Sequence, residues 1–205
     1  MTDRLPADGD GIRIAVEILR RGGLVAFPTD TVHGVACRGD DHRALTRLFE
    51  LKGRPAERRV AWLVSDLDQA RALGLIVDER ADRLAGSFWP GGLTLVLEAG
   101  DAAPAAVRPT LGVRAPDHPV AQQLLAAAGP LPTTSANPHG FPDTTSADDV
   151  LVAFAGQRLL DAVIEGESSG GVASSVLDLT SEPARLLREG AVSRAALEEM
   201  IGPID

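Results

Sequence analysis

The chain has 205 residues, of which 44% are apolar and 24% are charged, close to the averages for soluble globular proteins. This apolar fraction excludes a disordered chain, and the lack of any sequence repeat excludes collagen-like and coiled-coil architectures. With 20 basic and 29 acidic residues the formal net charge is -9, which disfavours non-specific binding to nucleic acid or to an anionic membrane.

Helix and strand patterns alternate along the chain, with no low-complexity segment between them. Apolar residues with helical spacing predict helices over residues 10–21, 41–51, 67–73, 77–86, 118–128 and 146–155, and a last helix that starts at Ser193. Short apolar runs predict strands over residues 24–27, 60–64, 93–98, 112–115, 131–134, 161–164, 174–179 and 185–188. Strands that alternate with helices are typical of an α/β fold, and the proline-rich turns favour a mixed sheet. We expect a single domain over residues 1–205.

No segment predicts a membrane span or a secretion signal. The longest apolar runs are far shorter than the roughly 20 residues that a membrane helix needs. The N-terminus MTDRLPADGDG lacks the apolar core of a signal peptide, and Cys37 has no second cysteine with which to form a disulfide. We therefore expect a cytoplasmic protein that has no contact with a membrane.

The signatures of common catalytic sites are absent from the sequence. It contains no GxGxxG, GxxxxGK[ST], GxSxG or HExxH segment. The histidines do not have the spacing of metal ligands; they are His33, His42, His118 and His139. We therefore expect no metal site built from the protein alone.

Several groups of polar residues follow predicted strands, which is where open α/β sheets bind their ligands. The groups are residues 28–34, the basic run of Lys52, Arg54, Arg58 and Arg59, then Arg114, residues 133–137, and residues 173–176 with Arg188. Together they supply Lys, Arg, Ser, Thr and Asn side chains, which suit phosphates and a carboxylate. Each group alone also fits an ordinary turn, or a helix end whose basic residues offset the helix dipole.

Lys52 is the only lysine among the 20 basic residues. In a chain so rich in arginine, a single lysine indicates a site that needs a compact ammonium, which a planar guanidinium does not replace. The alternative is a chance lysine at a helix end. If the first interpretation holds, Lys52→Ala should abolish turnover and, as a surface substitution, leave stability nearly unchanged.

Six segments have an order and spacing that can be compared with known families. They are GGLVAFPTDTVHGVAC, ELKGRP, FWPGGLTLVL, GVRAPDHPV, PLPTTSANPHG and SSVLDL with LLREGAVS, and they extend from about residue 12 to residue 194. These segments resemble the YrdC-like family. Because a KxR motif (Lys52, Arg54) is combined with an SxN motif (Ser135, Asn137), the chain is similar to the short, TsaC-type L-threonylcarbamoyladenylate synthases within that family. The resemblance implies a twisted mixed sheet with flanking helices around a deep, basic, concave cavity.

The resemblance also implies a reaction. L-threonine, bicarbonate and ATP would form threonylcarbamoyl-AMP and pyrophosphate, which makes the protein a nucleotidyltransferase. ATP would act as a substrate together with Mg²⁺, with no metal ion held tightly by the protein. Downstream tRNA threonylcarbamoyl-transferase proteins would use the product to modify adenosine 37 of tRNA.

On the family's pattern, the polar residues divide between two substrates. Those implied to bind ATP are Lys52 and Arg54, which are also the implied catalytic residues, with Arg58, Ser135, Asn137 and Arg188. Those implied to bind L-threonine are Thr31, Thr133, Ser174 and Arg114, whose guanidinium would hold the carboxylate.

Three positions depart from the family's pattern. His33 replaces the usual tyrosine of the first motif, Leu63 replaces a histidine, and His139 replaces a serine after the SxN motif. Since Leu63 removes an expected polar contact to threonine, we expect weaker discrimination against serine. The chain ends at Asp205, so we also expect no additional C-terminal domain and a more open cavity.

Three alternative functions are left open by the sequence. The first is a relative with the same fold that transfers a carbamoyl group, although such enzymes carry further domains for which 205 residues leave no room. The second is a module that binds tRNA or double-stranded RNA, which the acidic charge and the few aromatic residues disfavour beyond weak tRNA binding. The third is a family member that binds nucleotide without full synthase activity, as the changes at His33 and Leu63 permit.

Overall fold

The structure, a computed structural model, describes residues 2–53 and 60–205 of the chain. The strands are β1 (Asp3–Leu5), β2 (Val25–Phe27), β3 (Gly34–Ala36), β4 (Ala61–Leu63), β5 (Leu93–Glu98), β6 (Thr110–Arg114), β7 (Leu131–Ser135), β8 (Ala162–Ile164), β9 (Ser175–Asp178) and β10 (Arg185–Arg188). The helices are α1 (Gly9–Arg20), α2 (His42–Lys52), α3 (Leu67–Ala72), α4 (Glu79–Phe88), α5 (Pro119–Ala128), α6 (Ala147–Ala153) and α7 (Arg194–Ile201).

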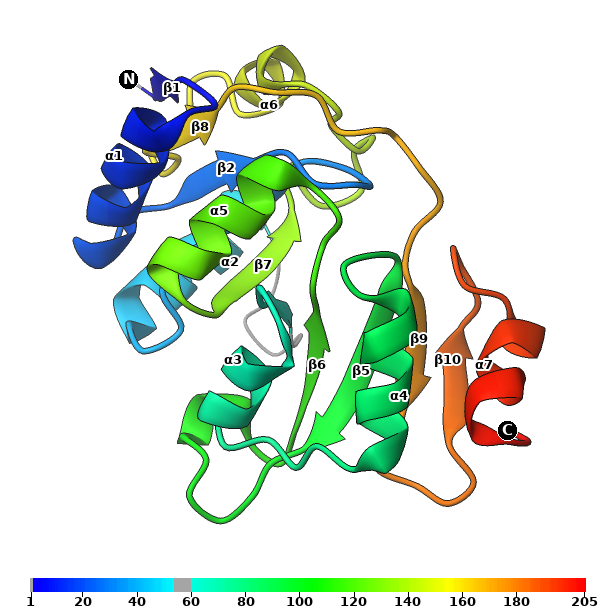
Figure 1. Ribbon diagram of the computed structural model, residues 1–205. Coiled ribbons are helices and arrows are strands. Elements are labelled where there is room, and N and C mark those ends of the chain that lie inside the picture. The colour runs from blue at the N-terminus through cyan, green and yellow to red at the C-terminus, as the bar shows by residue number, and fades with distance from the viewer. Residues whose placement is uncertain (1, 54–59) are drawn as a thin grey trace.

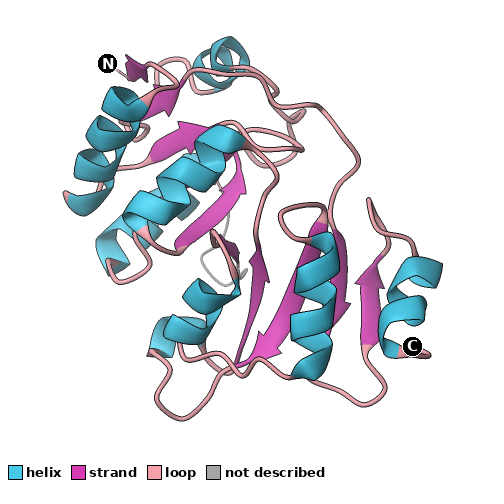
Figure 2. Ribbon diagram, in the orientation of Figure 1, coloured by secondary structure: helices cyan, strands magenta, loops and turns pink. Residues whose placement is uncertain are grey.

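Within the described residues, the strands form one sheet in the order β1-β8-β2-β3-β7-β4-β6-β5-β9-β10 (Figure 1). Parallel and antiparallel pairs both occur, since β4 runs parallel to β6 but antiparallel to β7. Figure 2 shows helices packed along this sheet. The fold class is therefore the expected mixed α/β sheet with flanking helices.

Each α-helix of the described chain begins next to a side chain that accepts hydrogen bonds from the free N–H groups of its first turn. The capping residues are Asp8, Asp41, Asp66, Asp78, His118, Ser146 and Ser193. At α6 the capping is reciprocal, because the Asp149 side chain also accepts from the Ser146 backbone N–H. These local signals explain why the predicted helix starts agree with the structure to within about two residues.

Three apolar clusters hold the helices against the sheet. One packs α1 and α5 against Val25 and Phe27, and a second packs α2 and α6 against Leu24 and Ala26. Since neighbouring residues of β2 point to opposite faces, this part of the sheet is covered on both sides. The third cluster packs α3, α4 and α7 against the face of β5, β6 and β9 that includes Leu95.

Two strands were not predicted from the sequence. The three small residues of β3 give no clear strand pattern, and only its pairing with β2 and β7 defines it. β1 is a short edge strand with two of its three residues exposed, and a 3₁₀ turn over Ala105–Val107 was also missed. Among the described residues, no helix has the length and apolar character needed to cross a membrane.

Candidate functional site

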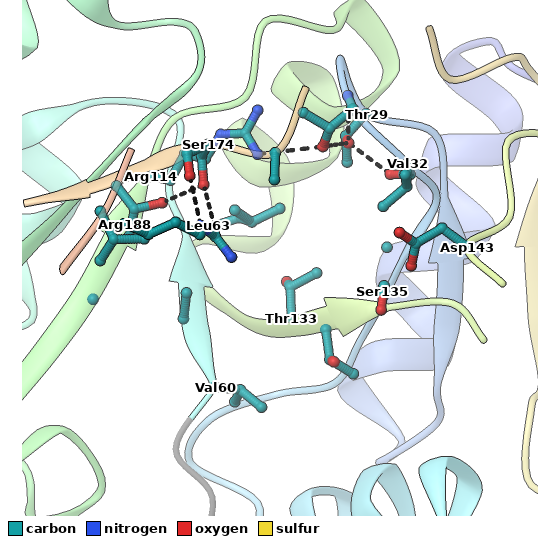
Figure 3. A pocket seen from close by; sticks show the side chains of 18 of the residues that line it. Thr29, Val32, Val60, Leu63, Arg114, Thr133, Ser135, Asp143, Ser174 and Arg188 are labelled. Carbon is teal, nitrogen blue, oxygen red and sulfur yellow. Dashed lines mark hydrogen bonds between the residues drawn. The ribbon is translucent and has the colours of Figure 1, made fainter. Parts of the chain in front are cut away.

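A cavity of about 650 Å³ opens on the face of β5 and β6 that lies opposite the third apolar cluster (Figure 3). Residues alternate between the two faces, as the two-residue period of a strand requires. Leu95 and Val113 point into the core, whereas Thr94, Val96 and Gly112 line the cavity. These small side chains leave a volume typical of a small-molecule site.

The loop between β2 and β3 brings threonine hydroxyls to the cavity. The Thr29 hydroxyl donates to the Val32 carbonyl (2.7 Å) and accepts from the Thr31 backbone N–H (3.2 Å). In the 3.2 Å contact between the two hydroxyls, Thr31 is therefore the donor. Arg114 Nη1 lies 3.4 Å from the Thr31 oxygen, which keeps a second lone pair that can accept an N–H or O–H of a ligand.

Arg114, at the end of β6, belongs to a buried ion pair. Its Nη2 lies 2.6 Å from both carboxylate oxygens of Asp30, and its Nε donates to the Gly91 carbonyl at 2.9 Å. Burial lowers the pKa of Arg114, and the neighbouring Asp30 carboxylate opposes this shift. The sequence reasoning missed Asp30 as a site residue, although Asp30 lies inside the PTDT segment of the first motif.

Ser174 and Arg188 meet beside Arg114 at the same end of the cavity (Figure 3). Arg188 donates from Nε to the Ser174 carbonyl (2.9 Å) and from Nη2 to the Ser174 hydroxyl (3.2 Å). That hydroxyl also lies 2.9 Å from the hydroxyl of Thr94 on β5. Arg188, predicted to bind nucleotide, therefore contacts a residue predicted to bind threonine.

Lys52, the last residue of α2, reaches the end of β7. Its Nζ donates to the Ser135 carbonyl (2.6 Å), to Asn137 Oδ1 (2.8 Å) and to the Ser135 hydroxyl (3.3 Å). The Ser135 hydroxyl donates in turn to Asn137 Oδ1 (2.6 Å), so the KxR lysine and the SxN motif form one polar cluster. Because Lys52 is only 4% exposed, it is not a surface residue, and the assumption behind the expectation that Lys52→Ala leaves stability unchanged is wrong.

His33, at the position of the family's tyrosine, is fully buried. Its Nδ1 lies 2.9 Å from the hydroxyl of Ser168, which accepts the backbone N–H of Thr29 at 3.1 Å. The Ser168 hydroxyl can donate to Nδ1 or accept from it, depending on the tautomer of the ring. Nε2 has no hydrogen-bond partner in the described part of the chain. Burial lowers the pKa of His33 to about 4, so the ring is neutral near pH 7.

The structure brings most of the predicted site residues together. Those that line the cavity are Thr31, Arg114, Thr133, Ser135, Ser174 and Arg188. Lys52 and Asn137 adjoin it through Ser135, whereas Arg54 and Arg58 lie outside the described residues. Leu63 also lines the cavity, as does Asp143, which the sequence reasoning missed and which lies beside Ser135 in Figure 3.

Across residues 2–53 and 60–205, no three His, Cys, Asp or Glu side chains are grouped to hold a metal ion.

Hydroxyl and guanidinium groups around a cavity of this size in an α/β domain suit small anionic molecules. The Sua5_yciO_yrdC family model, described as "Telomere recombination", matches residues 17–190. The chain therefore belongs to the Sua5/YciO/YrdC family, which confirms the resemblance seen in its motifs.

Known relatives resemble this chain over most of its length. A Pyrococcus abyssi protein named threonylcarbamoyl-AMP synthase is 40% identical over 198 residues, which are 94% of this chain but 58% of that protein. A Chromohalobacter salexigens protein of the same name is 42% identical over 179 residues, which are 84% of this chain and 94% of that protein. The crystal structure of P. abyssi Sua5 complexed with L-threonine matches with a TM-score of 0.89 at 37% identity, covering 100% of this chain and 62% of that one.

Proposed function

We propose that the protein is an L-threonylcarbamoyladenylate synthase. It converts L-threonine, bicarbonate and ATP into threonylcarbamoyl-AMP, pyrophosphate and water, and Mg²⁺ enters with ATP as part of the substrate. The chemical step is a nucleotidyl transfer. In this proposal the enzyme works in the cytoplasm and supplies its product to tRNA threonylcarbamoyl-transferase proteins.

The observation that carries the proposal is a cavity whose two ends are lined by different polar side chains. Arg114, Ser174 and Arg188 gather at one end, and Ser135 lies at the other, where Lys52 contacts it. The first end suits the carboxylate and hydroxyl of an amino acid, and the second suits phosphate groups. The names of the relatives and the L-threonine in the P. abyssi structure support the same assignment.

Threonine binds at the first end. Arg114 attracts its carboxylate, while the hydroxyls of Thr31, Thr133 and Ser174 contact its hydroxyl and amine. The amine combines with bicarbonate or dissolved carbon dioxide to form a carbamate, a reaction that needs no nucleophilic side chain. The contribution of the protein is to hold the amino acid in a fixed position next to the nucleotide.

ATP binds toward the second end. A carbamate oxygen attacks the α-phosphorus, the bond to the bridging oxygen breaks, and pyrophosphate leaves. Lys52, Ser135 and Asn137 bind the phosphates and stabilise the charge that moves onto them, and Arg54 and Arg58 are proposed to add to this charge stabilisation. Positioning and electrostatics therefore account for the catalysis.

The test is an incubation of the purified protein with MgATP, bicarbonate and radiolabelled L-threonine, followed by chromatography for threonylcarbamoyl-AMP. We expect pyrophosphate release that requires both threonine and bicarbonate, and equal release without threonine would overturn the amino-acid assignment. Arg114→Ala should raise KM for threonine by about one to two decades, because a charge-assisted contact is lost. Arg13→Ala, on an exposed face of α1, is the matched control that should change neither KM.

The same preparation tests the RNA-binding alternative. Filter binding with tRNA at moderate salt measures direct affinity, which a net charge of -9 should keep weak. Tight binding of tRNA without any synthase activity would favour an RNA-binding module.

A further inference from the structure

The guanidinium of Arg114 has most of its donors engaged within the protein. A guanidinium carries five N–H groups in a fixed fork. Nε donates to the Gly91 carbonyl, and Nη2 faces both oxygens of Asp30. Among the residues that the structure describes, this leaves Nη1 with a 3.4 Å contact to the Thr31 hydroxyl. The side chains of Arg114 and Asp30 are 9% and 16% exposed, so water screens this pair weakly.

Asp30 is itself held in place by the segment that leads from β8 to β9. The Ser169 hydroxyl donates to the Asp30 carbonyl, and the Gly170 N–H donates to the Thr31 carbonyl at 2.8 Å. Asp30 is not one of the residues that line the cavity, whereas Arg114 is. The Asp30 carboxylate is therefore placed to act on a ligand through Arg114.

This arrangement decides how Arg114 can meet a carboxylate. Two parallel N–H groups are needed to hold a carboxylate in the bidentate manner, and here Nε and Nη2 already have partners. Nη1 is the nitrogen left to face the cavity, next to Thr31. The Asp30 carboxylate offsets part of the charge of Arg114, and Arg188 adds positive charge at the same end of the cavity.

We propose that Asp30 is a positioning residue that orients Arg114 and so determines the affinity for the carboxylate of the amino-acid substrate. The inference rests on the proposed function, because it takes threonine as the ligand at this end of the cavity. Without Asp30, Nη2 has no anionic partner, and the guanidinium no longer holds Nη1 toward the ligand.

Calorimetry with L-threonine, with L-threoninol, which lacks the carboxylate, and with MgATP tests the proposal. In Asp30→Ala the affinity for threonine should fall about tenfold, while the affinities for threoninol and MgATP should change less than about twofold. Asp30→Asn keeps one acceptor oxygen for Nη2, so it should restore most of the threonine affinity and covers the case in which the alanine variant fails to fold.

The control is Asp178→Ala, which removes a buried carboxylate that pairs with Arg185 at the other end of β9 and should leave threonine binding unchanged. Equal losses for threonine and threoninol in Asp30→Ala, or unchanged or tighter threonine binding, would overturn the proposal. If the wild-type protein fails to bind threonine at all, the proposed function fails instead.

Discussion

Replacing Lys52 by alanine should lower stability as well as activity. The side chain is 4% exposed and its ammonium donates to three oxygens of Ser135 and Asn137. In the alanine variant the Ser135 carbonyl loses this donor, whereas Asn137 Oδ1 keeps the hydrogen bond from the Ser135 hydroxyl. The cluster that joins the end of α2 to the end of β7 is then broken.

The size of the effect follows from these contacts. A buried acceptor left without a donor costs about 1–3 kcal/mol, the half-buried Ser135 carbonyl toward the lower end, and hydrogen bonds from a charged donor are at the upper end of the usual range. The loss of the buried methylene stem adds to this cost. We therefore expect a decrease of about 3 kcal/mol in the free energy of unfolding, which for a chain of this size lowers Tm by roughly 6–12 °C.

Thermal unfolding of wild type, Lys52→Ala and Lys52→Met measures this effect. The methionine variant keeps most of the apolar stem and lacks the ammonium, so it should be less destabilised than the alanine variant but equally inactive. Arg43→Ala, an exposed position on the same helix, is the control and should stay within about 0.5 kcal/mol of wild type. A Tm of Lys52→Ala that equals the wild-type value would refute the reasoning.

Three further predictions concern buried or cavity-lining groups. Because the pKa of His33 is lowered to about 4, the unfolded chain takes up a proton at a higher pH than the folded chain. The free energy of unfolding should therefore fall by up to about 3 kcal/mol as the pH drops from about 6.5 to 4. The free energy of unfolding of His33→Phe should depend less on pH, and identical curves for the two proteins would contradict this. Leu63 lines the cavity in register with Arg114, so Leu63→His should increase the ratio of kcat/KM for threonine over serine, and an unchanged ratio would exclude position 63 from the amino-acid pocket. Burial raises the pKa of the Cys37 thiol to about 12, so a disulfide reagent at pH 8 should react with it only when the protein unfolds. Rapid labelling of the native protein would contradict this and show that the thiol is accessible.

The sequence by itself determined the helices and most strands, because their signals act between near neighbours. In α1 the apolar stripe of Ile12, Val16 and Leu19 is buried as its spacing predicts, and Asp8 caps the first turn. β3 shows the limit of such patterns, because three small residues become a strand only when β2 and β7 supply hydrogen-bond partners on either side.

The sequence also located many candidate site residues, since the motifs around Thr31, Arg114 and Ser135 match the family's pattern in both residue type and spacing. It did not reveal which of these side chains are buried or what they contact. The expectation for Lys52→Ala treated Lys52 as a surface residue, yet its side chain is buried against the end of β7. The sequence also did not show that burial lowers the pKa of His33 and keeps its ring neutral near pH 7.

Only the tertiary structure decided which groups meet. Asp30 and Arg114 are 84 residues apart, Lys52 and Asn137 are 85 apart, and the Ser168 partner of His33 is 135 residues away. These pairs form because sheet order places β3 beside β7 and β4 beside β6, although the strands are distant in the chain. Sheet order depends on how whole faces of strands and helices are buried together, and the spacing of residues within one segment carries no information about that.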